Sequence, residues 1–193
     1  MNEPHELKHW WNRQAGLAPY VGLHQGARDY CVFASIAGAV NHLMGQVVWT
    51  MDMLADAHAY KKGITDFSVA DTAIAPCSGV LIVQRPNSRD LPSQLSPSLI
   101  RNWVRQQGIV ILSLEAYSPD GSFAGWHMLS VVAESPALFQ VWDSTGYGGL
   151  LTDEEIMATL ERPPGGCGTL VPHRNQDAIA ILRSDRHGGA LRP

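Results

Sequence analysis

The stretch from Cys31 to Met44 constrains the fold more than any other part of this sequence, because nearly every residue in it is apolar or small. This density of apolar positions predicts a helix that is buried on almost all sides rather than an amphipathic surface helix. Gly45 follows where such a helix would end. A helix of this kind has to be covered by the rest of the chain, so the other elements are expected to pack around it.

A polar loop, His24 to Tyr30, runs directly into this helix and places Cys31 in its first turn. Backbone N–H groups there have no intrahelical partner, and the helix dipole is positive. Both effects favour the thiolate, which is the attacking form of cysteine. Gln25 precedes Cys31 on the same loop and can direct its amide at whatever the sulfur attacks. The alternative is that Cys31 is simply a small apolar residue in a buried helix, as free cysteines commonly are.

Apolar periodicity and capping residues predict helices mainly in the first half of the chain and antiparallel strands in the second. This order indicates an α+β fold rather than alternating βαβ units. We expect one domain, residues 1–193, with a helical lobe at about 1–108, a β-sheet lobe at 109–183 and a flexible tail at 184–193. Helices are expected at 3–13, 31–44, 50–62, 66–75, 96–107 and 152–161, and strands at 80–83, 109–114, 127–133, 138–142 and 178–182.

Composition excludes several functions. A chain of 193 residues with 45% hydrophobic and 17% charged residues is an ordinary globular protein. A net charge of −4 with scattered Lys and Arg does not supply the basic stripe of a nucleic-acid binder. The apolar runs are too short to span a bilayer, and the amino terminus has no secretory h-region, so we expect neither a membrane partner nor a signal peptide. A cytoplasmic location is expected, with secretion as an effector without a standard signal peptide left open.

The three cysteines, Cys31, Cys77 and Cys167, are too few and odd in number for a disulfide scaffold. Cys77 and Cys167 could pair with each other, which the sequence does not decide. The histidines form no recognisable metal-binding motif with Cys31. We therefore expect no metal and no cofactor. The oligomeric state is left open.

His127 and Asp143 stand where strands meet loops, at the start of the strand 127–133 and just after the strand 138–142. If these strands form a hairpin through the turn near Ser135, the two side chains become cross-strand neighbours. A carboxylate on one imidazole nitrogen fixes the tautomer and leaves the other nitrogen for a thiol. The alternative is a strand-end histidine and a turn-forming aspartate. A helix-terminal cysteine with a glutamine, a histidine and an aspartate is the set of groups used in thiol acyl transfer.

In these residues the sequence resembles the papain-like cysteine protease superfamily. Gln25 and Cys31 keep the family's glutamine-to-cysteine spacing, and the motif from Cys31 to Ser35 resembles its Cys-Trp-Ala-Phe-Ser. Trp126-His127-Met128 is similar to the histidine strand, and Asp143-Ser144-Thr145-Gly146 stands where the family has Asn-Ser-Trp-Gly. Val32 for Trp and Asp143 for Asn are departures, and an aspartate is common in bacterial relatives.

The resemblance implies a papain-like α+β fold and a cysteine peptidase that cleaves a peptide or protein substrate through an acyl-thioester. Cys31 would be the nucleophile, His127 the general base and then acid, and Asp143 the group that orients His127. Gln25 and the Cys31 N–H would form the oxyanion hole.

Trp126, Asp29 and Tyr30 are candidate substrate-binding residues by position, although Trp126 could also serve only in packing. Deamidation of a glutamine side chain, amide or acyl transfer to an amine, and a non-catalytic binding module on the same fold remain alternatives.

Overall fold

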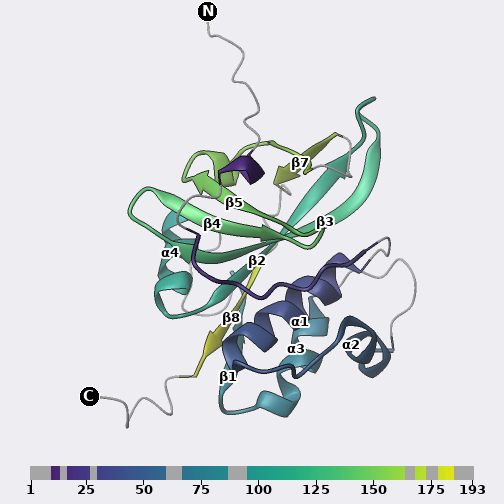
Figure 1. Ribbon diagram of the computed structural model, residues 1–193, viewed down its shortest axis with the longest axis vertical. Helices are drawn as coiled ribbons and strands as arrows, with labels where there is room; N and C mark the ends of the chain where they lie inside the picture. The colour runs from purple at the N-terminus through teal and green to yellow at the C-terminus, as the bar shows by residue number, and fades with distance from the viewer. Residues whose placement is uncertain are drawn as a thin grey trace, which may run out of the picture.

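A computed structural model of the chain describes residues 10–13, 17–26, 30–59, 67–86, 95–163, 168–172 and 178–184. Its centre is an antiparallel sheet with the strand order β1-β8-β2-β3-β4-β5, to which β6 and β7 are added beside β2 (Figure 1). The helices are α1 (Cys31–Met44), α2 (Met51–Ala57), α3 (Ser68–Ile74) and α4 (Pro97–Arg105), with 3-10 turns η1 (Trp10–Asn12), η2 (Ala75–Cys77) and η3 (Glu155–Met157). The strands are β1 (Leu81–Gln84), β2 (Ile109–Tyr117), β3 (Phe123–Glu134), β4 (Leu138–Asp143), β5 (Tyr147–Thr152), β6 (Leu160–Glu161), β7 (Thr169–Pro172) and β8 (Ala178–Arg183).

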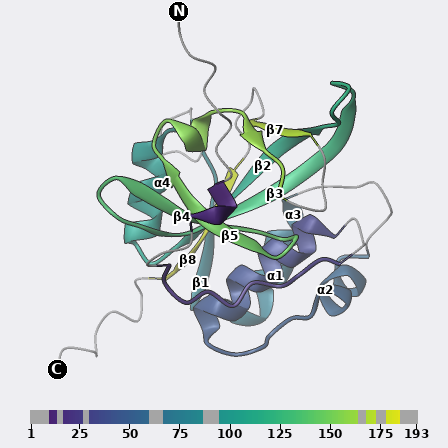
Figure 2. The ribbon, with the colours of Figure 1, turned by 45° about the horizontal axis from the view of Figure 1, so that its top comes forward.

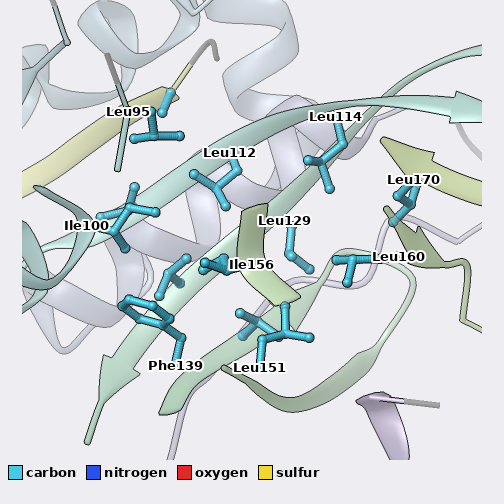
Figure 3. Close-up of a cluster of buried hydrophobic side chains, with 14 of the residues drawn as sticks. Leu95, Ile100, Leu112, Leu114, Leu129, Phe139, Leu151, Ile156, Leu160 and Leu170 are labelled. Atoms are coloured by element: carbon cyan, nitrogen blue, oxygen red, sulfur yellow. The ribbon is translucent and has the colours of Figure 1, made fainter. Parts of the chain in front are cut away.

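The sheet separates two hydrophobic clusters, and the alternating side chains of β2 contribute to both. Val110 and Leu112 belong to the cluster on the side of α4 and η1, part of which is drawn in Figure 3. Ile109 and Ile111 belong to the cluster formed with α1, α2 and α3. Successive strand residues point to opposite faces, so one strand can help to build two cores. Figures 1 and 2 show α1, α2 and α3 gathered together, with α4 against another part of the sheet.

The predicted central helix is confirmed as α1, with the predicted bounds. All its residues except His42 and Met44 are buried. Gly45 ends it in the left-handed conformation at φ 67°, and its backbone N–H donates to the carbonyl oxygen of His42 at 3.2 Å. Glycine adopts this conformation without the steric cost that other residues carry.

The other helices of the first half are present but shorter than predicted. Thr50 caps α2 as expected, with its hydroxyl accepting from the N–H of Met53 at 3.2 Å, but this helix ends at Ala57 rather than at 62. Ser96 caps α4 in the same way through the N–H of Leu99. The caps therefore located the beginnings of both helices correctly, whereas the ends depend on packing.

The predicted helix at 152–161 is wrong. The capping box itself forms, since the N–H of Glu155 donates to the hydroxyl of Thr152 at 3.2 Å and the N–H of Thr152 donates to the carboxylate of Glu155 at 2.9 Å. Only the 3-10 turn η3 follows, and Ala158 is extended before β6 begins. Ile156 and Leu160 both reach the cluster on the α4 side of the sheet. The cap was therefore predicted correctly, but tertiary packing replaces the helix expected after it with the turn η3 and the strand β6.

The glycine-rich sequence from Gly146 to Gly149 leads into the strand β5 and forms its first residues. A Cβ atom added at Gly149 would lie 2.2 Å from the carbonyl oxygen of Trp10. The glycine is therefore needed because η1 packs directly onto the strand. Trp10 and Trp11 are buried in the α4-side cluster.

The strand β1 comes from the first half of the chain and pairs with β8, so the sheet takes strands from both halves, and the division into lobes stays a prediction. Of the predicted amino-terminal helix at 3–13 the structure describes only 10–13, where η1 forms a 3-10 turn. The predicted tail begins at Ser184, whose N–H donates to the carbonyl oxygen of Val80 at 2.7 Å, and residues 185–193 lie outside the described part. Among the described helices, none has the length and apolar character needed to cross a membrane.

Candidate active site

Cys31 is the first residue of α1, and its sulfur lies against β3. The preceding residue, Tyr30, occupies the N-cap position without a side-chain hydrogen bond to the helix. The Cys31 Sγ atom is 3.7 Å from the carbonyl oxygen of Trp126, the residue immediately before His127. The side chain is buried, with 6% exposure. The fold therefore brings the sulfur from the helical half of the chain to the backbone that carries the histidine.

His127 and Asp143 form the predicted hydrogen bond, with 2.7 Å between Nε2 and Oδ2. The hairpin of β3 and β4 turns at Ser135, as expected, and its register pairs Asp143 with Leu129. His127 comes two residues before Leu129 in β3, so it meets Asp143 along the diagonal rather than directly across the ladder. The β4 pairing stops at Asp143, which leaves His127 at the end of the paired part of this hairpin. The Nδ1 atom is then the ring nitrogen that remains for chemistry.

The Asp143 carboxylate is fully buried and has three hydrogen-bond donors around it. Burial opposes its ionisation, but the positive charge and hydrogen bond of His127 and the hydrogen bonds from Thr145 favour it, and the pKa of Asp143 lies below its ordinary value. Oδ1 accepts from the N–H of Thr145 at 2.7 Å and from its hydroxyl at 2.5 Å. The carboxylate is thus fixed on the side away from His127, and its negative charge is available to stabilise an imidazolium.

The chain segment that leads to Gln25 is held along β4. The Gln140 side chain accepts from the N–H of Ala18 at 2.6 Å and donates to its carbonyl oxygen at 2.7 Å. Two residues further along β4, Trp142 packs so closely on Gly22 that a Cβ atom there would lie 2.1 Å from the indole nitrogen. Side chains two apart on a strand share a face, so one face of β4 aligns the incoming segment.

Gln25 is held at the end of this segment by Ser144. The Gln25 N–H donates to the carbonyl oxygen of Ser144 at 2.8 Å, and the Ser144 hydroxyl donates to Oε1 of Gln25 at 2.5 Å. Because Oε1 accepts from Ser144, the NH₂ end of the amide is turned to the opposite side. The amide therefore presents a donor in an orientation set by the residue next to Asp143.

The turn from Asp143 to Gly146 also contacts the Gln25 loop directly. The Gly146 N–H donates to the carbonyl oxygen of Asp143 at 2.9 Å, and Gly146 has φ +99°. A Cβ atom at Gly146 would lie 2.6 Å from the ring of His24. The glycine is thus required both by the backbone conformation and by the approach of the loop. Ser144, Thr145 and Gly146 were not predicted as site residues, although their position in the Asp-Ser-Thr-Gly motif was a signal for them.

The candidate substrate-binding residues differ in their placement. Trp126 is 36% exposed and contacts Phe123, with 5.6 Å between ring centroids. The Tyr30 ring is half-buried against Phe33 at 5.5 Å. Asp29 lies outside the described residues. A role for these three in substrate binding stays a prediction.

Cys77 and His58 lie in other parts of the described structure and have their own surroundings. Cys77 is a buried free thiol, whose pKa burial raises, and Cys167 lies outside the described residues. The His58 Nδ1 atom is 2.9 Å from the Thr72 hydroxyl. Within the described part of the chain, no group of His, Cys, Asp and Glu side chains could hold a metal ion.

The fold is similar to that of a solved structure, the peptidase domain of Streptococcus ComA, a bi-functional ABC transporter involved in quorum sensing. The TM-score is 0.51 at 11% sequence identity, over 86% of this chain and 98% of that one. The predicted papain-like α+β fold is confirmed. A candidate C39-like peptidase from Bacillus anthracis aligns with a TM-score of 0.48 at 11% identity, over 85% of this chain and 95% of that one. No family model and no curated protein matches the sequence. The chemistry of the site therefore has to be argued from its own residues.

Proposed function

We propose that this protein is a cysteine peptidase that cleaves a peptide or protein substrate, with Cys31 as the nucleophile. The observation that carries the proposal is the buried His127–Asp143 pair, 2.7 Å between Nε2 and Oδ2, beside a sulfur that contacts the carbonyl oxygen of Trp126. A histidine oriented by a carboxylate, next to a helix-terminal thiol, is the arrangement by which proteins activate a sulfur nucleophile. The peptidase fold of the structural neighbour is consistent with this function.

In the acylation step the Cys31 sulfur forms a bond to the carbonyl carbon of the substrate, and the carbonyl oxygen becomes an oxyanion. The oxyanion accepts hydrogen bonds from the Gln25 NH₂ group and the Cys31 backbone N–H. Each such donor contributes about 3 kcal/mol to the stability of the transition state. The carbon–nitrogen bond then breaks, and the departing amine takes a proton from the imidazolium of His127. The products of this step are an amine and a thioester on Cys31.

In the deacylation step water attacks the thioester carbon, and His127 accepts a proton from that water. The carbon–sulfur bond breaks, which releases a carboxylic acid and restores the thiolate and the imidazolium. Asp143 stays ionised throughout and stabilises the positive ring. We place the enzyme in the cytoplasm, and the proposed reaction uses no metal or cofactor.

The test is incubation of the purified full chain with a proteome-derived peptide library, followed by mass spectrometry of both the peptides and the protein. Hydrolysis by the wild-type protein is expected to create new amino termini, and an acyl adduct is expected on Cys31. The Cys31→Ala variant should fold normally and give neither. New termini made equally by that variant would contradict the proposal. Glutamine-to-glutamate conversion without new termini would replace it with deamidation, and peptides joined to added amines would replace it with acyl transfer.

A further inference from the structure

The hairpin of β2 and β3 carries a row of three aromatic rings, one half-buried and two exposed, that begins beside the candidate active site. Tyr117 and Phe123 have ring centroids 5.9 Å apart, and Phe123 and Trp126 have centroids 5.6 Å apart, both in edge-to-face contact. Phe123 is 54% exposed and Trp126 is 36% exposed. We call Tyr117, Phe123 and Trp126 the aromatic strip. Its inner end, Trp126, is the residue whose carbonyl oxygen contacts the Cys31 sulfur.

A β-bulge places these rings on one face. The register pairs Ala116 with Gly125 but Tyr117 with Phe123, so Ala124 is an extra residue in β3. Gly125 has φ +129°, a conformation that favours glycine. Phe123 and Trp126 are three positions apart, a spacing that in a regular strand would point them to opposite faces, and the bulge takes up one of these positions. Bulges commonly re-aim side chains next to functional sites.

The hairpin is fixed at its tip and extends beyond the rest of the sheet (Figures 1 and 2). The N–H of Ser118 donates to the carbonyl oxygen of Ser122 at 2.9 Å, and Asp120 accepts from both the N–H and the hydroxyl of Ser122. Exposed aromatic side chains on such a support lose little conformational freedom when they bind a partner, which favours affinity. Aromatic residues are also the side chains that most often dominate binding energy at interfaces.

The charge on this hairpin indicates what the strip would accept. Glu115 lies directly opposite Trp126 in the ladder, and its carboxylate accepts from the Tyr117 hydroxyl at 2.6 Å. Asp120 adds a second carboxylate at the tip, where its pKa is lowered by the hydrogen bonds from Ser122. No lysine or arginine occurs in the sequence between Arg105 and Arg162. The charged side chains that this hairpin itself contributes near the strip are therefore acidic, which complements a ligand that is apolar and basic.

We propose that the aromatic strip, with Glu115, binds the substrate polypeptide next to the bond to be cleaved and selects a large apolar side chain accompanied by lysine or arginine. This inference rests on the proposed peptidase function, because it treats the strip as the continuation of that active site. The occupant is a segment of the substrate in extended conformation, whose apolar side chain packs on Phe123 and Trp126 and whose cation pairs with Glu115.

The experiment compares the cleavage preferences of the wild-type protein and two single variants with the same peptide library. Phe123→Ala is expected to lower the preference for a large apolar residue about tenfold, since loss of a central aromatic contact costs more than about 1 kcal/mol. Glu115→Gln is expected to lower the preference for lysine or arginine several-fold and to leave the apolar preference in place. The matched control is Ile82→Ala, which removes another exposed apolar side chain, 38% exposed against 54% for Phe123, from the edge strand β1 and should change neither preference. Unchanged preferences in both strip variants would overturn the inference.

A second measurement separates this inference from the peptidase proposal. The Cys31→Ala variant, which does not turn over substrate, is immobilised and used to capture peptides from the library. Enrichment of peptides with a large apolar residue and a basic residue, lost when Phe123→Ala is added, supports the strip even if no peptide is cleaved by the wild-type protein. Capture of peptides without this enrichment would refute the binding role of the aromatic strip, whereas the peptidase proposal would still depend on the cleavage experiment.

Discussion

The Asp143→Asn variant tests how the buried histidine is oriented, because it keeps the size of the side chain and removes one acceptor. In the native protein Oδ2 bonds to His127, and Oδ1 accepts from both the N–H and the hydroxyl of Thr145. Asparagine has a single oxygen. Its amide can accept from the ring of His127 or from the N–H of Thr145, but not from both.

The magnitude of the effect follows from the group that loses its acceptor. With the oxygen toward His127, the buried N–H of Thr145 is unsatisfied, at a cost of about 1–3 kcal/mol. With the oxygen toward Thr145, the NH₂ group faces Nε2 and selects the tautomer with the proton on Nδ1, which cannot accept a proton from Cys31. The second orientation avoids the penalty and is therefore preferred. The productive orientation is then about 5- to 150-fold less populated, and kcat/KM should fall by the same factor.

The free energy of unfolding should change much less than the activity. In the preferred orientation every buried group retains a partner, and because His127 is neutral no unpaired charge is left buried. We expect a change within about 1 kcal/mol in denaturant unfolding, together with an imidazole ¹⁵N spectrum that shows the proton on Nδ1. Asp143→Ala is the control, since it leaves both His127 and Thr145 without an acceptor and should destabilise the protein by several kcal/mol.

Two results would refute this reasoning. Wild-type activity in Asp143→Asn would mean that the carboxylate does not orient the ring during catalysis. A loss of stability as large as that of Asp143→Ala would mean that the competition for a single acceptor does not exist. His127→Ala sets the lower limit of activity, because loss of general acid–base catalysis costs about 10²–10⁴-fold.

Further predictions concern the support of the glutamine and the anchoring of η1. Ser144→Ala removes the hydroxyl that donates to Oε1 of Gln25, a hydrogen bond worth about 0.5–1.5 kcal/mol. We therefore expect kcat to fall about 2- to 10-fold with little change in KM. An unchanged kcat in steady-state assays would show that Ser144 does not position the amide. The Arg13 guanidinium, bonded to Glu155 at 2.7 Å on both oxygens, lowers the pKa of Glu155 to about 2. A lowered pKa adds stability above the ordinary carboxyl range that is lost as pH falls through the folded value. The Tm difference between wild type and Glu155→Gln should therefore be present at pH 7 and shrink between about pH 4 and pH 2; a difference independent of pH would contradict the ion pair.

The parts of the fold that follow from local chemistry were predictable from the sequence. The dense apolar run and Gly45 define α1, and the hydroxyls of Thr50 and Ser96 cap α2 and α4. The turn at Ser135 brings His127 and Asp143 together, as expected from the spacing of the two strands. Each of these features depends on residues close in sequence.

The parts that depend on distant residues were not predictable in the same way. The capping box at Thr152 forms, but the burial of Ile156 and Leu160 ends the helix after one turn. Gly149 has to be a glycine because the backbone of Trp10, far away in the sequence, packs directly on it. Likewise, the orientation of the Gln25 amide depends on a hydroxyl that belongs to the opposite half of the chain. A sequence pattern indicates which side chains are present and what their neighbours along the chain are, but it does not show which distant residues they contact in the fold.

The central claim is that Cys31 is an ionised sulfur paired with His127, and the rate of its alkylation by iodoacetamide tests this most directly. The rate constant is measured from pH 5 to pH 9 by mass spectrometry of the Cys31 peptide, in the wild-type protein and in His127→Ala. We predict fast labelling that hardly depends on pH around neutrality in the wild type, and slow labelling that rises about tenfold per pH unit in the variant. A wild-type rate that rises steeply with pH and is unaffected by His127→Ala would contradict the account.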